Sequence, residues 1–174
     1  GLTVSPIGTR LQACAELKAL GLWGQTNAAV KAALERPEAV IDLPVTKNIL
    51  IGSNGLSLAA MGKGIPAATT HKMPLVGDVS QAAARVAAVG PGIHLFGGET
   101  TVRLTGTGRG GRNQELALRV ALLAEYQNWQ GRWLYLQAGT DGRDGPTDAA
   151  GGVVCEASVS VMRSVGIDPN HLLA

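Results

Sequence analysis

Three glycine-rich stretches divide the second half of this chain, and they constrain its fold more than any other feature. They cover residues 97–101, 106–115 and 139–148, and each follows a segment with the pattern of a strand. Glycine accounts for 24 of the 174 residues, whereas aromatic residues make up only 3%. A core of Ala, Val, Leu and Ile with glycine-rich loops is typical of an α/β protein whose loops approach a ligand closely.

The chain alternates between predicted strands and predicted helices. We expect strands at 48–52, 65–71, 93–96, 100–105 and 133–137, and helices at 9–20, 26–35, 53–61, 78–89 and 113–126. Strands separated by helices favour an α/β fold with a largely parallel or mixed sheet and helices on both faces. Ligands bind such sheets at the carboxyl ends of the strands, so the three loops form the candidate site.

Composition excludes several classes of function. The net charge is only +2 and the basic residues are scattered, so we expect no nucleic-acid partner. Cys14 and Cys155 share no metal-binding or redox spacing, which favours two reduced thiols. No apolar run approaches the roughly 20 residues needed to cross a membrane, and the first residues do not resemble a leader peptide. We expect no membrane association and a cytoplasmic location, and we interpret the chain as a fragment.

The second glycine-rich loop is a candidate anion site. Gly108, Gly110 and Gly111 precede the longest predicted helix, whose first N–H groups and positive dipole end attract phosphate or carboxylate. Arg112 and Asn113 stand where that helix begins, and a guanidinium can hold such a group through two bonds. A simple cap or hairpin is the alternative interpretation. Gly106, Gly108 and Gly111 also satisfy a dinucleotide-binding pattern, although the ribose-binding acid is missing from the next strand.

The third loop is a candidate metal or base site. It carries Asp141, Asp144 and Asp148 within eight residues, and Thr140 precedes them. Glu99, which follows another predicted strand, would lie nearby in a parallel sheet. Carboxylates of this kind suit Mg²⁺, or a base that deprotonates a hydroxyl. Aspartates beside glycine and proline also form simple Asx-turns, so a purely structural role stays open for each.

Two further segments offer backbone and polar contacts to a ligand. Gly97 and Gly98 begin the first glycine-rich loop. Ser53 and Asn54 follow a predicted strand and would contact a nucleotide or, equally well, cap a helix. We include both segments among the candidate binding residues.

The three motifs together resemble a known family. They read GGETTV from Gly97, GRGGRNQELAL from Gly108 and GTDGRDGPTDAAG from Gly139. In this order they are similar to the MOFRL-type C-terminal region of class II glycerate kinases, also labelled hydroxypyruvate reductases. The resemblance implies that the chain is an internal fragment of a two-domain enzyme. It assigns residues 1–90 to the C-terminal part of an N-terminal kinase region and residues 91–174 to an incomplete MOFRL-type region. Residues 65–76 fit the family pattern poorly.

The resemblance implies an activity and its cofactors. The resemblance implies transfer of a phosphoryl group from ATP to the 2-hydroxyl of D-glycerate, in a cleft between two domains, and we expect ATP and Mg²⁺ as cofactors. Glu99 and Arg112 match positions in that cleft. The family's N-terminal lysine region, its Ser-Gly-Pro-Thr segment and its closing motif are absent from this sequence. We therefore expect a small-molecule substrate and a nucleotide as partners, while a homo-oligomer stays open.

Two other functions remain as alternatives. An NAD(P)H-dependent hydroxypyruvate reductase is motivated by the dinucleotide-binding pattern, and a non-catalytic ligand-binding module by the absent motifs. For the kinase we predict Arg112, Glu99, Asp141 and Asp144 as catalytic residues. The last two would also bind the metal.

Overall fold

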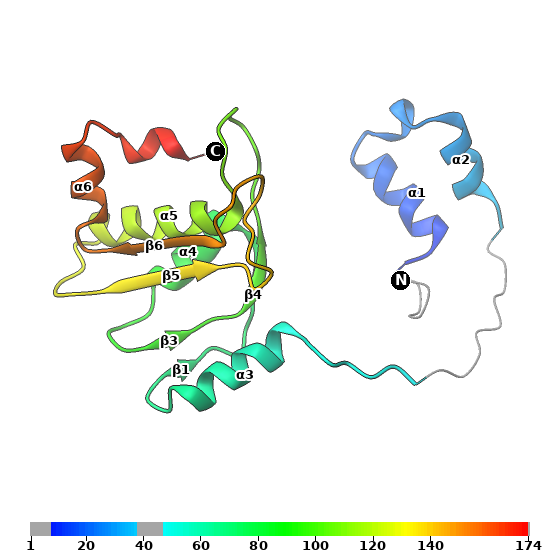
Figure 1. Ribbon diagram of the computed structural model, residues 1–174. Helices are drawn as coiled ribbons and strands as arrows, with labels where there is room; N and C mark the ends of the chain where they lie inside the picture. Colours follow the sequence, from blue (N-terminus) through cyan, green and yellow to red (C-terminus); the bar gives the residue numbers. More distant parts are fainter. Residues whose placement is uncertain (1–7, 38–46, 174) are drawn as a thin grey trace. The chain divides into compact units, whose positions relative to one another are not determined.

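The computed structural model describes residues 8–37 and 47–173 (Figure 1). Packing divides the chain into two compact units, Gly1–Ile51 and Gly52–Ala174. The second unit contains all three glycine-rich loops, so the candidate site is sought there.

The first unit is a pair of helices joined by a short 3₁₀ helix. Its elements are α1 (Arg10–Ala19), η1 (Trp23–Gln25) and α2 (Ala28–Glu35). Thr9 begins α1 through a capping box, in which its hydroxyl accepts a bond from the Gln12 N–H and its own N–H donates to the Gln12 side chain. Gly21 follows with φ of 69°, a conformation that favours glycine after a helix. Both helices predicted here are confirmed.

The second unit is a mixed α/β structure. Its elements are α3 (Asn54–Gly64), β1 (Thr69–Thr70), β2 (Leu75–Asp78), α4 (Val79–Ala87), β3 (His94–Leu95), β4 (Gly98–Thr101), α5 (Arg112–Tyr126), β5 (Leu134–Ala138), β6 (Gly151–Cys155), α6 (Ser158–Ser164) and η2 (Pro169–Leu172). Ser53 and Asp78 begin α3 and α4 by accepting bonds from backbone N–H groups two or three residues ahead. The three helices predicted in this unit are confirmed, although α3 continues through Gly62 and Gly64.

The strands form three separate pairs. β1 pairs with β3 and β2 with β4, both in parallel, whereas β5 and β6 are antiparallel. The mixed arrangement agrees with the predicted fold class. The loop of residues 139–150 joins β5 to β6, so the third glycine-rich segment is the connection between two antiparallel strands.

Several strand predictions are wrong in position. Residues 48–52 form no strand, and Ile49, Leu50 and Ile51 are 71%, 73% and 95% exposed because no strand in the described residues pairs with them. Strand β4 begins at Gly98, two residues before the predicted start at Thr100, because Gly98–Thr101 pairs with Leu75–Asp78. Residues 102–105 are irregular, although we predicted a strand there. The strands β2 and β6 and the helix α6 were not predicted.

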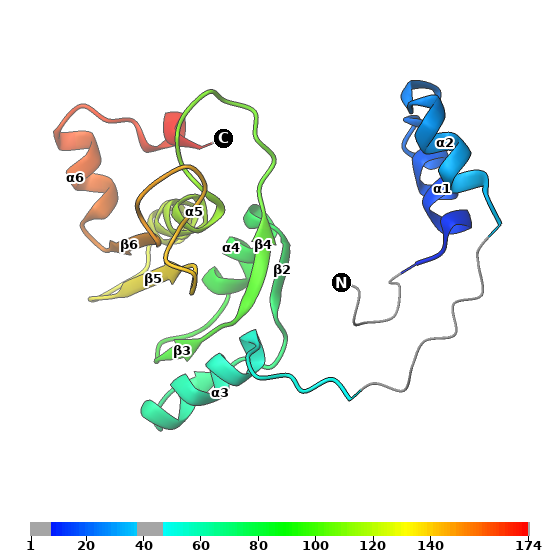
Figure 2. The ribbon, with the colours of Figure 1, turned by 45° about the vertical axis from the view of Figure 1, so that its right-hand side comes forward.

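Helix α5 organises the core of the second unit. Leu116 and Val120 pack against Val79, Ala83 and other buried residues of α4. Ala117 and Ala121 form a second cluster with residues of β6 and α6. Figures 1 and 2 show α5 lying along the β5–β6 pair with α4 beside it. Because α5 is held on both sides, its first turn has a fixed position relative to the strands.

No helix in the two described ranges combines the length and the apolar character that a membrane-spanning segment needs.

Candidate active site

A pocket of about 760 Å³ collects most of the predicted site residues. Five segments line it: α3 with the two residues before it, Leu75 of β2, the β4 strand with the two residues before it, the start of α5, and the end of β5 with the turn that follows. The predicted residues that it brings together are Ser53, Asn54, Gly97, Gly98, Glu99, Arg112, Asn113, Thr140 and Asp141. Gly108, Gly110, Gly111 and Asp144 are not among the lining residues.

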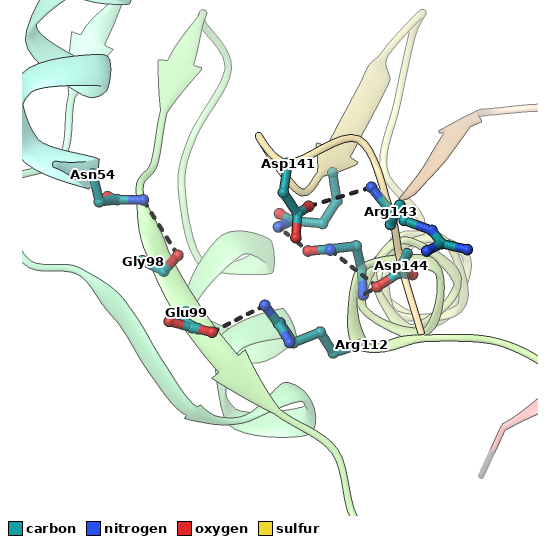
Figure 3. A network of polar contacts seen from close by, with 9 residues as sticks. Asn54, Gly98, Glu99, Arg112, Asp141, Arg143 and Asp144 are labelled. Carbon is teal, nitrogen blue, oxygen red and sulfur yellow. Dashed lines mark hydrogen bonds and ion pairs between the residues drawn. The ribbon is translucent and has the colours of Figure 1, made fainter. Parts of the chain in front are cut away.

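Arg112 and Glu99 form an ion pair at the edge of this pocket (Figure 3). Arg112 is the first residue of α5, and its Nη2 donates to Glu99 Oε1 of β4 at 3.0 Å. The two side chains are 42% and 76% exposed. A solvent-exposed pair of this kind contributes little to stability, so the guanidinium can exchange Glu99 for an anionic ligand at small cost.

The start of α3 contacts the start of β4. The Asn54 side chain donates from Nδ2 to the Gly98 carbonyl at 3.3 Å. A Cβ on Gly97 would overlap the Asn54 side chain, and one on Gly98 would overlap the backbone of Leu75. The two glycines therefore allow β4 to approach α3 and β2 closely, and this packing accounts for them without a ligand.

Asp144 lies behind the pocket wall and is only 2% exposed. Its Oδ1 accepts bonds from the backbone N and the side-chain Nδ2 of Asn113, both at 3.0 Å, and its Oδ2 accepts one from the Gln114 backbone N at 2.8 Å. The N–H groups that we predicted for a bound anion are thus occupied by the chain's own carboxylate. The predicted anion site therefore depends on the Arg112 side chain and not on these two N–H groups.

A hydrogen-bonded chain runs from Asp144 to the middle of β5. Gln137 Nε2 donates to Asn113 Oδ1 at 2.9 Å, and the Tyr135 hydroxyl donates to Gln137 Oε1 at 2.8 Å. Burial raises the pKa of Tyr135 well above its ordinary value, so its hydroxyl stays a donor. Because the phenol donates at one end and a carboxylate accepts at the other, the orientation of each amide between them is fixed.

The turn after β5 brings Asp141 to the pocket. Its Oδ1 accepts a bond from the Arg143 backbone N at 3.3 Å, which is the Asx-turn contact that we considered as an alternative. Asp141 is exposed and lines the pocket together with Gly139 and Thr140. The structure therefore provides a structural role and leaves the carboxylate accessible to a ligand.

Of the remaining predicted glycines, Gly110 and Gly111 lie against the loop that carries Asp144, and Gly108 does not. A Cβ on Gly111 would overlap the Asp144 carboxyl group, whereas a Cβ on Gly108 or Gly110 would meet no atom within 4 Å. Gly145, with φ of 58°, comes so close to the Gly110 carbonyl that a Cβ there would overlap it. Arg109 also donates to the Pro146 carbonyl at 2.8 Å. Much of the second glycine-rich motif therefore packs against, or bonds to, the third motif.

The carboxylates do not fit a metal site shared by Asp141 and Asp144. Both oxygens of Asp144 already accept hydrogen bonds from Asn113 and Gln114, and the side chain is buried. Within the described part of the chain, no group of three or more His, Cys, Asp or Glu side chains is placed to hold an ion. We therefore derive no chemical step from Mg²⁺.

Three polar residues at the site were not predicted from the sequence: Gln137 lines the pocket, and Gln114 and Thr147 support it. Gln114 Nε2 donates to Thr147 Oγ1 at 3.0 Å, and the Thr147 hydroxyl donates to the Asp144 carbonyl at 2.7 Å. In the strand segment Leu134–Ala138, Tyr135 and Gln137 are the two residues with polar groups, and Gln137 is the one near the end. That position, just before the third glycine-rich loop, was the available signal.

Comparisons with known proteins agree with the motifs. Residues 92–174 match the MOFRL family. A D-glycerate 2-kinase of Thermotoga maritima is 49% identical over 83 residues, which are 48% of this chain and 19% of that protein. A glycerate 2-kinase of Pyrococcus horikoshii is 33% identical over 150 residues, which are 76% of this chain and 33% of that protein.

The fold is similar to that of a glycerate kinase whose structure is solved. The crystal structure of a glycerate kinase from Thermotoga maritima aligns with a TM-score of 0.65 and 32% sequence identity, over 95% of this chain and 42% of that one. The chain thus spans less than half of the relatives that it matches. It belongs to the glycerate 2-kinase family and carries a MOFRL family domain at residues 92–174.

Proposed function

We propose that the protein carrying this chain transfers the γ-phosphoryl group of ATP to the 2-hydroxyl of D-glycerate. The observation that carries the proposal is the placement of Arg112 at the edge of a pocket shared by three family motifs. Relatives named glycerate kinase or D-glycerate 2-kinase support the same reaction. Phosphoryl transfer depends mainly on positioning and charge neutralisation, which a guanidinium supplies.

Arg112 would bind the carboxylate of glycerate or the phosphoryl group in transfer. Its planar fork matches two oxygens of either group, and its ion pair with Glu99 sets its direction when no ligand is bound. Glu99 and Asp141 are the two carboxylates that line the pocket. Either would accept a proton from the hydroxyl of the substrate, and Asp141 would also face a cation that accompanies the nucleotide.

A second oxygen-rich ligand, ATP, needs donors for its phosphates. The pocket offers the side chains of Ser53, Asn54 and Thr140 and the backbone of Gly139. We propose these groups, with Gly97 and Gly98, as the nucleotide contacts contributed by this chain. The family's other motifs, which this sequence lacks, would complete the cleft, so we expect residues 1–174 alone to bind ligands without turnover.

The reductase alternative is less well supported. A dinucleotide pyrophosphate needs free N–H groups at the start of the helix that follows the glycine pattern. Here the N–H groups of Asn113 and Gln114 already bond to Asp144. We therefore retain ATP as the proposed cofactor.

A cytoplasmic location and the division of the sequence near residue 90 also remain proposals.

The intact protein should be assayed with both substrate sets. ATP and D-glycerate should release ADP, whereas hydroxypyruvate should not oxidise NADH or NADPH. Glycerol is a matched control acceptor, because it keeps the 2-hydroxyl and lacks the carboxylate that Arg112 would bind. ADP formation that is equally fast with glycerol would contradict the role of Arg112, and NADH oxidation without ADP formation would reject the kinase proposal.

A further inference from the structure

Asp144 is a buried carboxylate whose charge is balanced by a helix and not by a cation. It is 2% exposed, and none of the ion pairs formed by the described residues includes it. A buried charge is costly unless it is hydrogen-bonded or paired. Here three N–H donors of Asn113 and Gln114 and the positive end of the α5 dipole supply that compensation.

This carboxylate replaces the missing local cap of α5. Gly111 occupies the N-cap position and has no side chain with which to accept a bond. Asp144, 31 residues ahead of Asn113, fills the role from another loop. The two loops are also in close contact, because side chains on Gly111 or Gly145 would overlap atoms of the opposite loop. The start of α5 is therefore fixed by residues far away in the sequence.

The same carboxylate sets the orientation of two amide side chains that line the pocket, those of Asn113 and Gln137. Because Asn113 donates to Asp144 through Nδ2, its Oδ1 is turned to accept from Gln137. Asn113 and Gln137 both line the pocket, and Arg112 immediately precedes Asn113. The side-chain nitrogens of Asn113 and Gln137 each carry a second hydrogen, which can bond to a ligand oxygen.

We propose that Asp144 is a positioning residue for the anion site, acting through Asn113 and through the first turn of α5. The proposal rests on the function proposed above. Asp144 holds the backbone that carries Arg112, and it fixes the orientation of the Asn113 and Gln137 amide groups that line the pocket. It touches neither substrate nor metal. This separates it from Asp141, which lies in the same loop and lines the pocket.

The first experiment compares Asp144→Asn with wild type in the intact protein. An amide at this position turns one nitrogen toward the N–H donors, so it loses the charge and at least one of the three bonds. We expect kcat/KM for glycerate to fall roughly tenfold to a hundredfold through a higher KM. The Mg²⁺ concentration for half-maximal activity should stay unchanged. Asp148 is exposed and is not among the residues that line the pocket, so Asp148→Asn is the matched control in the same loop and should behave as wild type.

Each outcome of this experiment decides the proposal. A large increase in the Mg²⁺ requirement with an unchanged KM for glycerate would make Asp144 a metal ligand and overturn it. Unchanged kinetics would also overturn it. If Asp144→Asn does not fold, Asn113→Ala tests the same wall, because it keeps both backbone bonds to Asp144 and removes only the amide. A higher KM in Asn113→Ala supports the proposal, and an unchanged KM contradicts it.

A second measurement does not depend on the reaction. Hydrogen exchange at the Asn113 and Gln114 backbone amides should become at least tenfold faster in Asp144→Asn, since these are the bonds that it weakens. Asp148→Asn should leave both rates unchanged. If the wild-type protein fails to phosphorylate glycerate, the proposed function is wrong, but this exchange result still tests the anchoring of α5. Unchanged exchange at both amides would overturn the positioning proposal.

Discussion

Arg112 Nη2 lies 3.0 Å from Glu99 Oε1, and this pair joins the first residue of α5 to the β4 strand beside the pocket. The contact links the first and second glycine-rich motifs, which are 13 residues apart along the chain at these two positions. It presents a guanidinium at the pocket while keeping its charge balanced in the absence of a ligand.

Arg112→Lys should preserve the fold and reduce the activity of the intact protein. Lysine keeps the positive charge but cannot make two parallel bonds to a carboxylate or phosphoryl group. Loss of one charge-assisted bond costs about 1.5–3 kcal/mol, which predicts a drop in kcat/KM of about tenfold to a hundredfold. Arg109→Lys in the same loop is the control, because Arg109 bonds to the Pro146 carbonyl outside the pocket. Equal losses in both variants would contradict a specific role for Arg112.

Glu99→Gln should affect activity much more than stability. The Glu99 side chain is 76% exposed, so its ion pair contributes no more than about 1 kcal/mol to the free energy of unfolding. Its removal should still lower kcat/KM by about tenfold, since Arg112 loses the partner that directs it. The matched variant is Glu125→Gln, which breaks the pair with Arg163 on the surface. Activity that falls equally in Glu125→Gln would count against this interpretation of Glu99.

Gly111→Ala and Gly108→Ala should differ in stability. A methyl group on Gly111 would overlap the Asp144 carboxyl group, whereas one on Gly108 would meet no atom within 4 Å. Overpacking of this kind typically costs about 1–3 kcal/mol, measurable by denaturant unfolding. Gly108→Ala should unfold like the wild type. If Gly108→Ala abolishes activity at unchanged stability, Gly108 contacts a ligand directly, as the sequence first suggested.

Stability should fall at alkaline pH through Tyr135. Its pKa is raised in the folded protein by burial, so the unfolded chain ionises first, near the ordinary value of 10.0. The contribution of Tyr135 is complete below that pH and is lost above it, with a slope of up to about 1.4 kcal/mol per pH unit. Tyr135→Phe should lack this slope in unfolding experiments from about pH 9 to pH 11. Tyr126→Phe, at an 88% exposed position, should keep it, and identical slopes in all three proteins would refute the assignment.

Three of the helices begin at capping residues that can be recognised in the sequence, while the strands were harder to predict. Thr9, Ser53 and Asp78 each accept a backbone bond at the start of a helix, a local contact that is visible in sequence. Strand pairing is not local. Gly98–Thr101 is a strand only because residues 75–78 lie beside it, and its glycine suggested a loop.

The pocket residues could be predicted from the motifs, but their roles could not. Arg112, Glu99 and Asp141 lie together because the loops converge beside one helix terminus. Asp144 looked equivalent to Asp141 in sequence, since both are aspartates beside glycine. Its burial depends on contact with Asn113 and Gln114, 30 or more residues away, and no local pattern reports such a contact. Gln137 was missed for the same reason.

The most direct test of the central claim is the identity of the product. The intact protein should be incubated with ATP and D-glycerate, and the product examined by phosphorus NMR without proton decoupling. Transfer to the 2-hydroxyl gives a phosphate ester coupled to one proton, and therefore a doublet that grows in step with ADP. A triplet would place the phosphate on the terminal carbon and contradict the proposed position. ADP without any ester signal, or no ADP at all, would contradict phosphorylation of glycerate.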